Sequence, residues 1–284
     1  MADVGKLMVE FFGSERLAIL DALGAGPRRY TDLARTLKAS EGELSRNLNR
    51  LAENGLVAKG ADGGFQRTPL AASLLTYVPN LRFFAERADF VRTHAVHQLP
   101  ASALQNIHAL GQAEFRSDLM GVFEGIQTVF RTVKKQFLAQ WIIGETVWDD
   151  RQLAQQEELA ARIHQNETEV RAVVLKEELP VYENLPGEVL KRMKTRVVPS
   201  AAASIAMSDT HALVNFNGLD GRIDINYAFF GNDPQFLAWT QAVFEDGWAR
   251  GAPFPGVIKS RVVDGRLPNP ATLAAPPTRP RARK

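Results

Sequence analysis

The chain has 284 residues, of which 45% are hydrophobic and 23% charged, a composition typical of a globular protein with about two domains. The absence of cysteine excludes disulfides, thiolate-bound zinc, iron–sulfur clusters and a cysteine nucleophile. No stretch is apolar for long enough to cross a membrane, and the first residues lack the layout of a signal peptide. We therefore expect a cytoplasmic protein that makes no membrane contact.

The net charge of +2 is unevenly distributed. Residues 1–78 carry 10 Lys and Arg against 9 Asp and Glu, residues 79–255 carry 17 against 22, and residues 256–284 carry 7 against 1. The last segment is also rich in proline, which predicts a disordered basic tail. Such a tail either adds non-specific affinity for a polyanion such as DNA or is simply a solvated charge run.

Short helices are predicted at the start of the chain. Leu17, Leu20 and Leu23 recur at helical spacing before the helix-breaking residues 24–27. Thr31 is expected to cap a second helix.

A third helix and a hairpin complete a winged-helix pattern. Ser40 and Glu43 form an S-x-x-E capping box, which predicts that the third helix starts at Ser40, and Gly55 ends it. Residues 56–59 and 65–68, separated by the glycine-rich turn 60–64, predict a β-hairpin. Helix, helix-turn-helix and hairpin is the order of a winged-helix domain.

The third helix has two distinct faces. Its inner face consists of three leucines at positions i, i+4 and i+7: Leu44, Leu48 and Leu51. Its outer face and flank carry side chains suited to DNA: Ser45, Arg46, Asn49 and Arg50. Arginine can bind guanine with two hydrogen bonds, asparagine can bind adenine, and serine can bind phosphate. Because Glu53 shares this face, an ordinary solvated helix remains the alternative.

Further DNA contacts are expected around this helix. They would come from residues near the second helix, from the start of the third helix and from the wing: Arg28, Arg29, Thr31, Ser40, Lys59 and Arg67. The near-neutral charge of residues 1–78 makes this a local interface rather than a broadly basic surface.

Strands and helices alternate in the rest of the chain. Strands are predicted at 139–143, 169–175, 196–199, 204–207, 211–216 and 223–230, and helices at 123–137, 151–166, 182–194 and from Pro234 to the stop at Gly251. This pattern predicts an α/β domain with a mixed sheet whose last strands are antiparallel, so that the whole chain is α+β. The expected organisation is a winged helix-turn-helix domain at 1–78, a helical linker or dimerisation region at 79–122, an α/β effector-sensing domain at 123–255 and the tail at 256–284.

A polar cluster in the α/β region suggests a ligand pocket. Its candidate residues are Trp148, Asp209, His211, Arg222 and Asp224. Aspartates beside antiparallel strands are also common turn formers, which is the competing interpretation. His94, His97 and His108 lack neighbouring carboxylates and are interpreted as structural or surface residues. No dinucleotide, Walker A, serine-elbow or zincin motif occurs, so no metal, cofactor or catalytic residue is predicted.

Several segments resemble archaeal transcription regulators. Residues 13–23 (GSERLAILDAL), 30–34 (YTDLA) and 44–57 (LSRNLNRLAENGLV) resemble ArsR-like winged helices. Residues 90–100 (FVRTHAVHQLP) resemble the linker of two-domain regulators related to the methanogenesis regulatory protein family. Residues 209–248 resemble the sensor domain of that family more loosely.

This resemblance implies a phospholipase-D-like sensor fold of the kind found in TrmB-type, sugar-responsive regulators. The enzymes of that fold carry an H-x-K-x-x-x-x-D motif, whereas Leu213 stands in the place of the lysine after His211. The resemblance therefore implies a sensor without phospholipase chemistry.

The first interpretation is a non-enzymatic regulator that binds double-stranded DNA as a homodimer and responds to a small-molecule effector or a protein partner. The alternative is an O-methyltransferase-like enzyme, because such enzymes also begin with a winged-helix dimerisation domain. That class needs a glycine-rich loop for the methyl donor, whereas residues 141–145 (WIIGE) contain one glycine, Gly144, and no E/D-x-G-x-G follows. A third interpretation is a scaffold that binds a protein partner without DNA.

Overall fold

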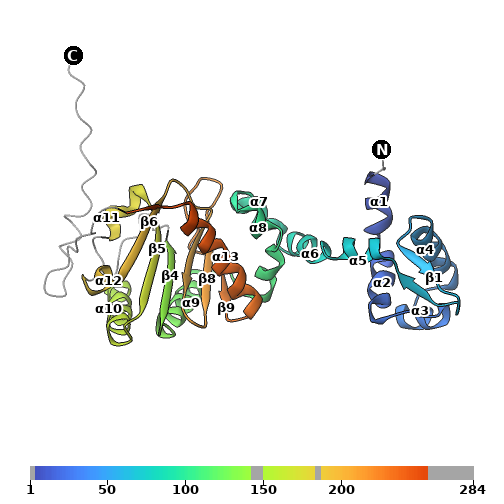
Figure 1. The fold of residues 1–284 in the computed structure, drawn as a ribbon, viewed down its shortest axis with the longest axis horizontal. Coiled ribbons are helices and arrows are strands. Elements are labelled where there is room, and N and C mark those ends of the chain that lie inside the picture. Colours follow the sequence, from blue (N-terminus) through green and yellow to red (C-terminus); the bar gives the residue numbers. More distant parts are fainter. Residues whose placement is uncertain (1–3, 142–149, 183–186, 255–284) are drawn as a thin grey trace, which may run out of the picture. The chain divides into compact units, whose positions relative to one another are not determined.

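The computed structural model describes residues 4–141, 150–182 and 187–254 (Figure 1). The chain divides after Arg82 into two compact units. Trp148 and the tail at 256–284, both singled out by the sequence analysis, lie outside the described residues.

The first unit is a helix-turn-helix followed by a two-stranded wing. Its elements in order are α1 (Val4–Phe11), α2 (Ser14–Ala22), the 3-10 turn η1 (Leu23–Ala25), α3 (Tyr30–Leu37), α4 (Glu41–Glu53), β1 (Val57–Lys59), β2 (Phe65–Arg67) and α5 (Pro69–Leu75). The antiparallel strands β1 and β2 pair Val57 with Arg67 and Lys59 with Phe65. This order confirms the winged-helix arrangement expected from the sequence.

The ends of α4 follow the sequence signals. The Ser40 hydroxyl accepts a hydrogen bond from the Glu43 amide at 3.3 Å and donates to a Glu43 carboxylate oxygen at 2.7 Å. At the other end, Gly55 adopts a φ of +67°, a left-handed conformation that favours glycine. The N-cap at Ser40 and the glycine stop are therefore confirmed, whereas the Glu43 carboxylate binds the Ser40 hydroxyl and not the Ser40 amide of a full capping box.

The start of α3 differs from the expectation. Arg29 is its N-cap residue, so Thr31 lies inside the first turn of the helix and does not cap it. The helix begins at Tyr30, and the Tyr30 hydroxyl donates to the Glu41 carbonyl at 2.5 Å.

A mixed sheet of eight strands forms the centre of the second unit. Its strands are β3 (Glu114–Arg116), β4 (Gln136–Trp141), β5 (Glu169–Leu175), β6 (Met193–Val198), β7 (Ala203–Met207), β8 (Ala212–Phe216), β9 (Ala228–Gly231) and β10 (Ala252–Pro253). Their order is β10-β6-β5-β4-β7-β8-β9-β3, with β4, β5 and β6 parallel and every other pair antiparallel. The predicted α/β domain with a mixed sheet is confirmed.

Helices cover both faces of this sheet (Figure 1). On one face, α9 (Leu119–Arg131) and α10 (Asp150–Gln165) bury Val129 and Ile163 against Phe137 of β4. On the other face, α13 (Pro234–Arg250) buries Phe236 and Phe244 in a second core. Alternate residues of β4, β7, β8 and β9 serve the two cores, as the pleat of a β-strand requires.

The helices at 83–112 also belong to the second core. They are the end of α6 (Val78–Glu86), then α7 (Ala88–Thr93), η2 (Val96–Gln98), α8 (Ala101–Leu104) and η3 (Ile107–Gln112). Phe83, Phe90 and Ile107 are buried there with residues of β7, β8 and α13. From Phe83 onward, the region that the sequence analysis set apart as a linker at 79–122 is thus part of the second unit, because its large apolar side chains need the sheet to cover them.

Several element boundaries differ from the sequence patterns. The helix predicted at 123–137 ends at Arg131, and Phe137 lies in β4. The strand predicted at 223–230 is regular only from Ala228, because Asp224 makes a side-chain turn by accepting from the Asn226 amide at 2.9 Å.

The region predicted as one helix at 182–194 also differs. The described helices there are α11 (Leu179–Tyr182) and α12 (Gly187–Arg192), and strand β6 begins at Met193. The short edge strands β3 and β10 had no sequence signal, since strands of two or three residues show no periodicity.

Candidate nucleic-acid interface

The outer face of α4 is polar, basic and accessible. Leu44, Leu48 and Leu51 are buried in the core of the first unit, which fixes the rotation of the helix about its axis. Four side chains are consequently exposed on the opposite side: Ser45, Arg46, Asn49 and Arg50. The sequence-predicted face of the third helix is therefore free to approach a ligand. Its two arginines and its asparagine offer the donors and acceptors that read bases in a major groove.

Three further predicted residues lie at the start of α3 and beside the wing. Arg28 pairs with Phe65 of β2 through two backbone hydrogen bonds of 2.9 and 2.8 Å, which attaches this segment to the wing. Its guanidinium donates to the Thr36 hydroxyl at 3.3 Å. Arg29 and Thr31 are exposed at the first turn of α3. These side chains can reach phosphates, as residues beside a recognition helix do.

Lys59 is the exposed cation of the wing. Its ammonium group lies 5.7 Å from the centre of the Phe65 ring, a cation–π contact that holds the side chain over the hairpin. The wing therefore presents one fixed positive charge, which suits a phosphate contact more than base recognition.

Two of the predicted DNA contacts have structural partners instead. The Ser40 hydroxyl is engaged in the capping box with Glu43. Arg67 donates from Nε to the Leu20 carbonyl and from Nη2 to the Asp21 carbonyl at 3.1 Å, so its guanidinium caps the end of α2. Because both groups are already hydrogen-bonded within the fold, neither is free for DNA without breaking these contacts.

Arg16, which was not among the predicted site residues, is a buried arginine that contacts α4. Arg16 of α2 is only 8% exposed and donates from Nη1 to Oδ1 of Asn47 on α4 at 3.2 Å. Its other nitrogens donate to the carbonyls of Val9 at 2.7 Å and Glu10 at 2.6 Å, at the end of α1. The sequence showed an arginine inside a leucine-rich helix but gave no sign of its distant partner.

The predicted ligand cluster of the second unit does not come together. Asp209 lies in the turn between β7 and β8, where its carboxylate accepts from the amides of Lys134 at 2.8 Å and Lys135 at 3.0 Å. Asp224 lies in the loop that follows the other end of β8. The intervening strand has five residues, so at about 3.3 Å per residue Asp209 and Asp224 lie at opposite ends of β8.

The remaining members of that cluster also have local roles. His211 stacks on Phe230 with ring centres 5.8 Å apart, and its Nδ1 lies 3.0 Å from the Thr210 hydroxyl. Arg222 is exposed in the loop, where its amide donates to the Asp220 carboxylate at 3.0 Å. The turn-former interpretation therefore describes this region better than a pocket does.

His94 is a buried polar residue that contacts the loop after β8. It is 3% exposed, it stacks on Phe90 at 3.9 Å, and its Nε2 lies 3.5 Å from the Asp224 carboxylate. The backbone at His94 bridges to Gly218, so residues 90–100 are fastened to the loop after β8. This supports the structural interpretation of the histidine. In the part of the chain that the structure covers, no three His, Asp or Glu side chains gather as a metal site requires.

Within residues 4–141, 150–182 and 187–254, every helix is too short or too polar to cross a bilayer.

Residues 14–59 match the family model described as a helix-turn-helix domain. The match covers α2 to β1, which includes both helices of the motif and the first strand of the wing. The first unit is therefore a winged helix-turn-helix domain. No curated protein matches the chain.

Among solved structures, the chain is similar to TrmBL2, which is described as an archaeal chromatin protein with a novel mode of DNA binding. The match has 12% identity and a TM-score of 0.39, and it covers 88% of this chain and 98% of the TrmBL2 chain. It is also similar to the dimethyltransferase RosA from Streptomyces davawensis, at 15% identity over 68% and 63% of the two chains, with a TM-score of 0.25. The methyltransferase CalO1 of calicheamicin biosynthesis matches at 15% identity over 70% and 66%, with a TM-score of 0.23. TM-scores this low do not establish a common fold for the whole chain.

Proposed function

We propose that this protein is a DNA-binding transcription regulator that reads duplex DNA with α4. One observation carries the proposal: in a helix-turn-helix domain, the helix that would enter the major groove exposes Arg46, Asn49 and Arg50 together. Arg28, Arg29 and Lys59 flank this face and supply positive charge for phosphates. The regulator would work in the cytoplasm, where the DNA of a prokaryotic cell lies.

The proposed active form is a homodimer. The first unit leaves large apolar side chains exposed on α1, on α5 and near the start of α6: Val4, Met8, Val9, Leu70, Tyr77 and Leu81. Large apolar side chains left exposed at several positions of one unit suit an interaction site. A second copy of the chain would cover it and would place two α4 helices on two half-sites of one operator.

The proposed role of the second unit is to sense a small-molecule effector or a protein partner, without a catalytic step or a cofactor. The resemblance of residues 90–100 to the linker of archaeal two-domain regulators supports this role. These residues follow the winged-helix unit in the chain and are fastened to the loop after β8 through His94 and Ala95, whose amide donates to the Asn217 carbonyl at 2.8 Å. A ligand that favours one arrangement of this segment would shift the DNA affinity.

Fluorescence anisotropy tests the DNA-binding proposal. The full chain is titrated onto the promoter fragment upstream of its own gene and onto a scrambled fragment, over a series of salt concentrations. The double variant Arg46→Ala/Arg50→Ala should lose the preference for the promoter and bind it at least about tenfold more weakly, since a two-pronged arginine–guanine contact contributes about 1–3 kcal/mol.

The matched control is Arg92→Ala/Arg131→Ala, which removes the same charge from exposed positions of the second unit. This control should keep the promoter preference. Equal and weak binding of wild type and both variants to either fragment would contradict the proposal. The winged helix would then be a dimerisation module or a scaffold, and binding of a methyl donor would become the next measurement.

A further inference from the structure

Asn47 lies at the border between the buried and the exposed face of α4. Around the helix axis it is about 40° from the buried Leu51 and about 60° from the exposed Arg50, at 3.6 residues per turn. Its own side chain is half-buried. Residues three apart on a helix are neighbours on its surface, so Asn47 and Arg50 are neighbours there. Asn47 is therefore placed to add a contact at the edge of the proposed DNA surface.

The orientation of the Asn47 amide is fixed by its hydrogen bond to Arg16. Nη1 of Arg16 lies 3.2 Å from Oδ1 of Asn47. A guanidinium has only donors, so the amide oxygen, and not the amide nitrogen, must face it. Arg16 is 8% exposed, and its other nitrogens are held by the carbonyls of Val9 and Glu10. The guanidinium therefore has no freedom to turn away, and the amide is held with it.

The amide nitrogen of Asn47 is left as an unused donor. Nδ2 makes no hydrogen bond to any other described residue, and it is not among the buried polar atoms that lack a partner, so it reaches solvent. Asn49, by contrast, is exposed and hydrogen-bonds to no other described residue. The two-pronged recognition of adenine needs both the oxygen and the nitrogen of an amide. Asn49 can offer both, whereas Asn47 offers a donor only.

A donor backed by a cation suits an anionic acceptor. The Asn47 oxygen accepts from the positively charged Arg16, and hydrogen bonds in a chain polarise one another, which makes the N–H groups at Nδ2 stronger donors. The carboxylate of Glu10 lies 3.6 Å from Nε of Arg16, whereas Asn47 is bound at Nη1. Phosphate and sugar groups accept half or more of the hydrogen bonds that proteins make to DNA, including those of asparagine side chains.

We infer that Asn47 donates a hydrogen bond from Nδ2 to a phosphate oxygen of the DNA backbone, at the edge of the face formed by Arg46, Asn49 and Arg50. This contact positions α4 and carries no sequence information, because every nucleotide presents the same phosphate. Arg16 is its positioning residue, since it holds the amide with the nitrogen outward. The contact rests on the proposed DNA-binding function and adds one residue to it.

Two variants separate the donor from the other properties of the Asn47 side chain. Asn47→Asp keeps an oxygen for Arg16, lacks the donor and adds a negative charge, whereas Asn47→Leu keeps the shape and lacks donor, acceptor and charge. In fluorescence anisotropy, both should bind the promoter and the scrambled fragment at least about tenfold more weakly than the wild type, and the preference for the promoter should remain. The control Gln112→Glu makes the same amide-to-carboxylate change at an exposed position of the second unit and should bind like the wild type.

Urea unfolding of the same chains shows whether the fold is kept. Asn47→Asp should unfold at the wild-type midpoint, since Arg16 keeps an acceptor. Weaker DNA binding by Asn47→Leu alone would make Asn47 only a support for Arg16, and weaker binding by Asn47→Asp alone would be charge repulsion. Either result, or unchanged binding by both variants, would overturn the inference. Loss of the promoter preference in both variants would indicate a base contact and would overturn the phosphate assignment.

Uncharged phosphate analogues locate the contact. Promoter fragments carry a methylphosphonate, in which a methyl group replaces one phosphate oxygen, at one position at a time. At one phosphate of each half-site, this replacement should weaken binding of the wild type at least about twofold more than binding of Asn47→Leu. Equal effects on the two proteins at every position would overturn the inference.

The wild-type titration separates this contact from the proposed function. A wild type that binds neither fragment removes the proposed function and the contact with it. A wild type that prefers the promoter through Arg46 and Arg50, together with Asn47 variants that bind like it, keeps the regulator and removes only the contact.

Discussion

The guanidinium of Arg16 reaches across the first unit to Asn47, with Nη1 3.2 Å from the asparagine Oδ1. The same side chain satisfies the carbonyls of Val9 and Glu10 at the end of α1. This one buried guanidinium thus joins α1, α2 and α4. Its contact on α4 is Asn47, the residue next to Arg46 of the exposed face. The position of α4 therefore depends on a buried residue that lies outside its exposed face.

Replacement of Arg16 should therefore affect both stability and DNA binding. Arg16→Met leaves two helix-end carbonyls and the Asn47 amide without their donor, and we expect a loss of about 2–4 kcal/mol in the free energy of unfolding. Urea unfolding of the full chain measures it. Arg35→Met, whose side chain is 81% exposed, should change stability by less than about 0.5 kcal/mol. Equal effects of the two variants would show that the Arg16 contacts contribute nothing.

The capping box at the start of α4 gives a second prediction. Ser40→Ala removes the hydroxyl that binds the Glu43 amide and should cost about 1 kcal/mol of stability. Ser45→Ala changes an exposed serine without a capping role and should be neutral. If Ser40 instead serves as a phosphate contact, Ser40→Ala would weaken DNA binding while leaving the unfolding curve unchanged.

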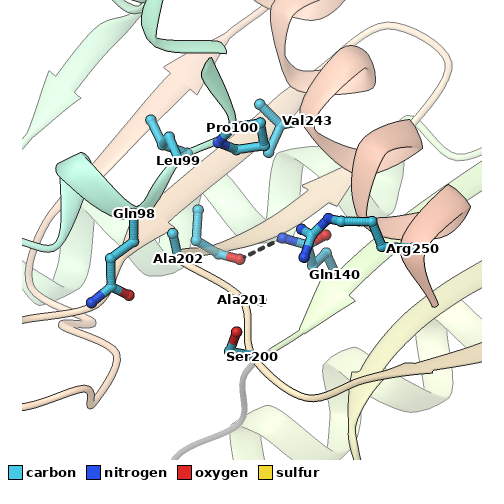
Figure 2. Close-up of a pocket in the computed structure, with 10 residues that line it drawn as sticks. Gln98, Leu99, Pro100, Gln140, Ser200, Ala201, Ala202, Val243 and Arg250 are labelled. Carbon is cyan, nitrogen blue, oxygen red and sulfur yellow. Dashed lines mark hydrogen bonds between the residues drawn. The ribbon is translucent and has the colours of Figure 1, made fainter. Parts of the chain in front are cut away.

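A close approach between α13 and β4 makes Gly247 sensitive to substitution. A Cβ at this position would overlap Oε1 of Gln140, so Gly247→Ala displaces the buried Gln140 amide from its hydrogen bond to the Ala203 carbonyl (Figure 2) and should destabilise the chain by about 1–3 kcal/mol. Gly111→Ala meets open space and is the control. The double variant Gly247→Ala/Gln140→Ala should lose less stability than the two single changes added together. Additive losses would argue against the close approach.

The ion pair between Arg171 and Glu245 predicts a pH dependence. Nη1 and Nη2 of Arg171 each lie 2.7 Å from a carboxylate oxygen, and this hydrogen bonding lowers the pKa of Glu245, although partial burial opposes the shift. The folded pKa lies below the unfolded one, so the pair stabilises the protein above the unfolded pKa, and this stability is lost as the pH falls through the folded pKa.

Thermal unfolding of Glu245→Gln measures this effect. The variant should be less stable than the wild type at neutral pH, by less than about 1 kcal/mol because the carboxylate is 41% exposed. The difference should disappear in acid. A difference that stays constant across this range would show that charge does not produce it.

Local patterns predicted the first unit well, because its helices are short and amphipathic and their ends carry explicit signals. The leucines of α4, the Ser40 capping box and Gly55 each lie within a few residues of the feature they determine. The exposed face of α4 follows from that spacing alone. The roles of Arg67 and Arg16 did not follow, since their partners lie 47 and 31 residues away.

The second unit shows the limits of the same reasoning. Its long strands were recognisable from apolar runs, and the predicted strand at 169–175 coincides with β5. The candidate ligand residues were grouped by their nearness in sequence, whereas β8 separates Asp209 from Asp224. Gln140 gave no signal at all, since a single polar residue inside an apolar strand does not reveal whether its amide is satisfied.

The edge strand β3 pairs only with β9, so Glu114–Arg116 acquire their partner at Ala228–Phe230. The Trp239 indole likewise donates to the Ala103 carbonyl, 136 residues earlier in the chain. During synthesis, the helices at 83–112 therefore leave the ribosome long before the strand and the helix that cover them. The winged-helix unit can fold on its own local contacts, whereas the second unit keeps apolar side chains exposed until residues 228–250, which form β9 and α13, have been made. Truncation or stalling before Ala228 would thus yield a chain whose first unit is complete and whose remainder depends on chaperones.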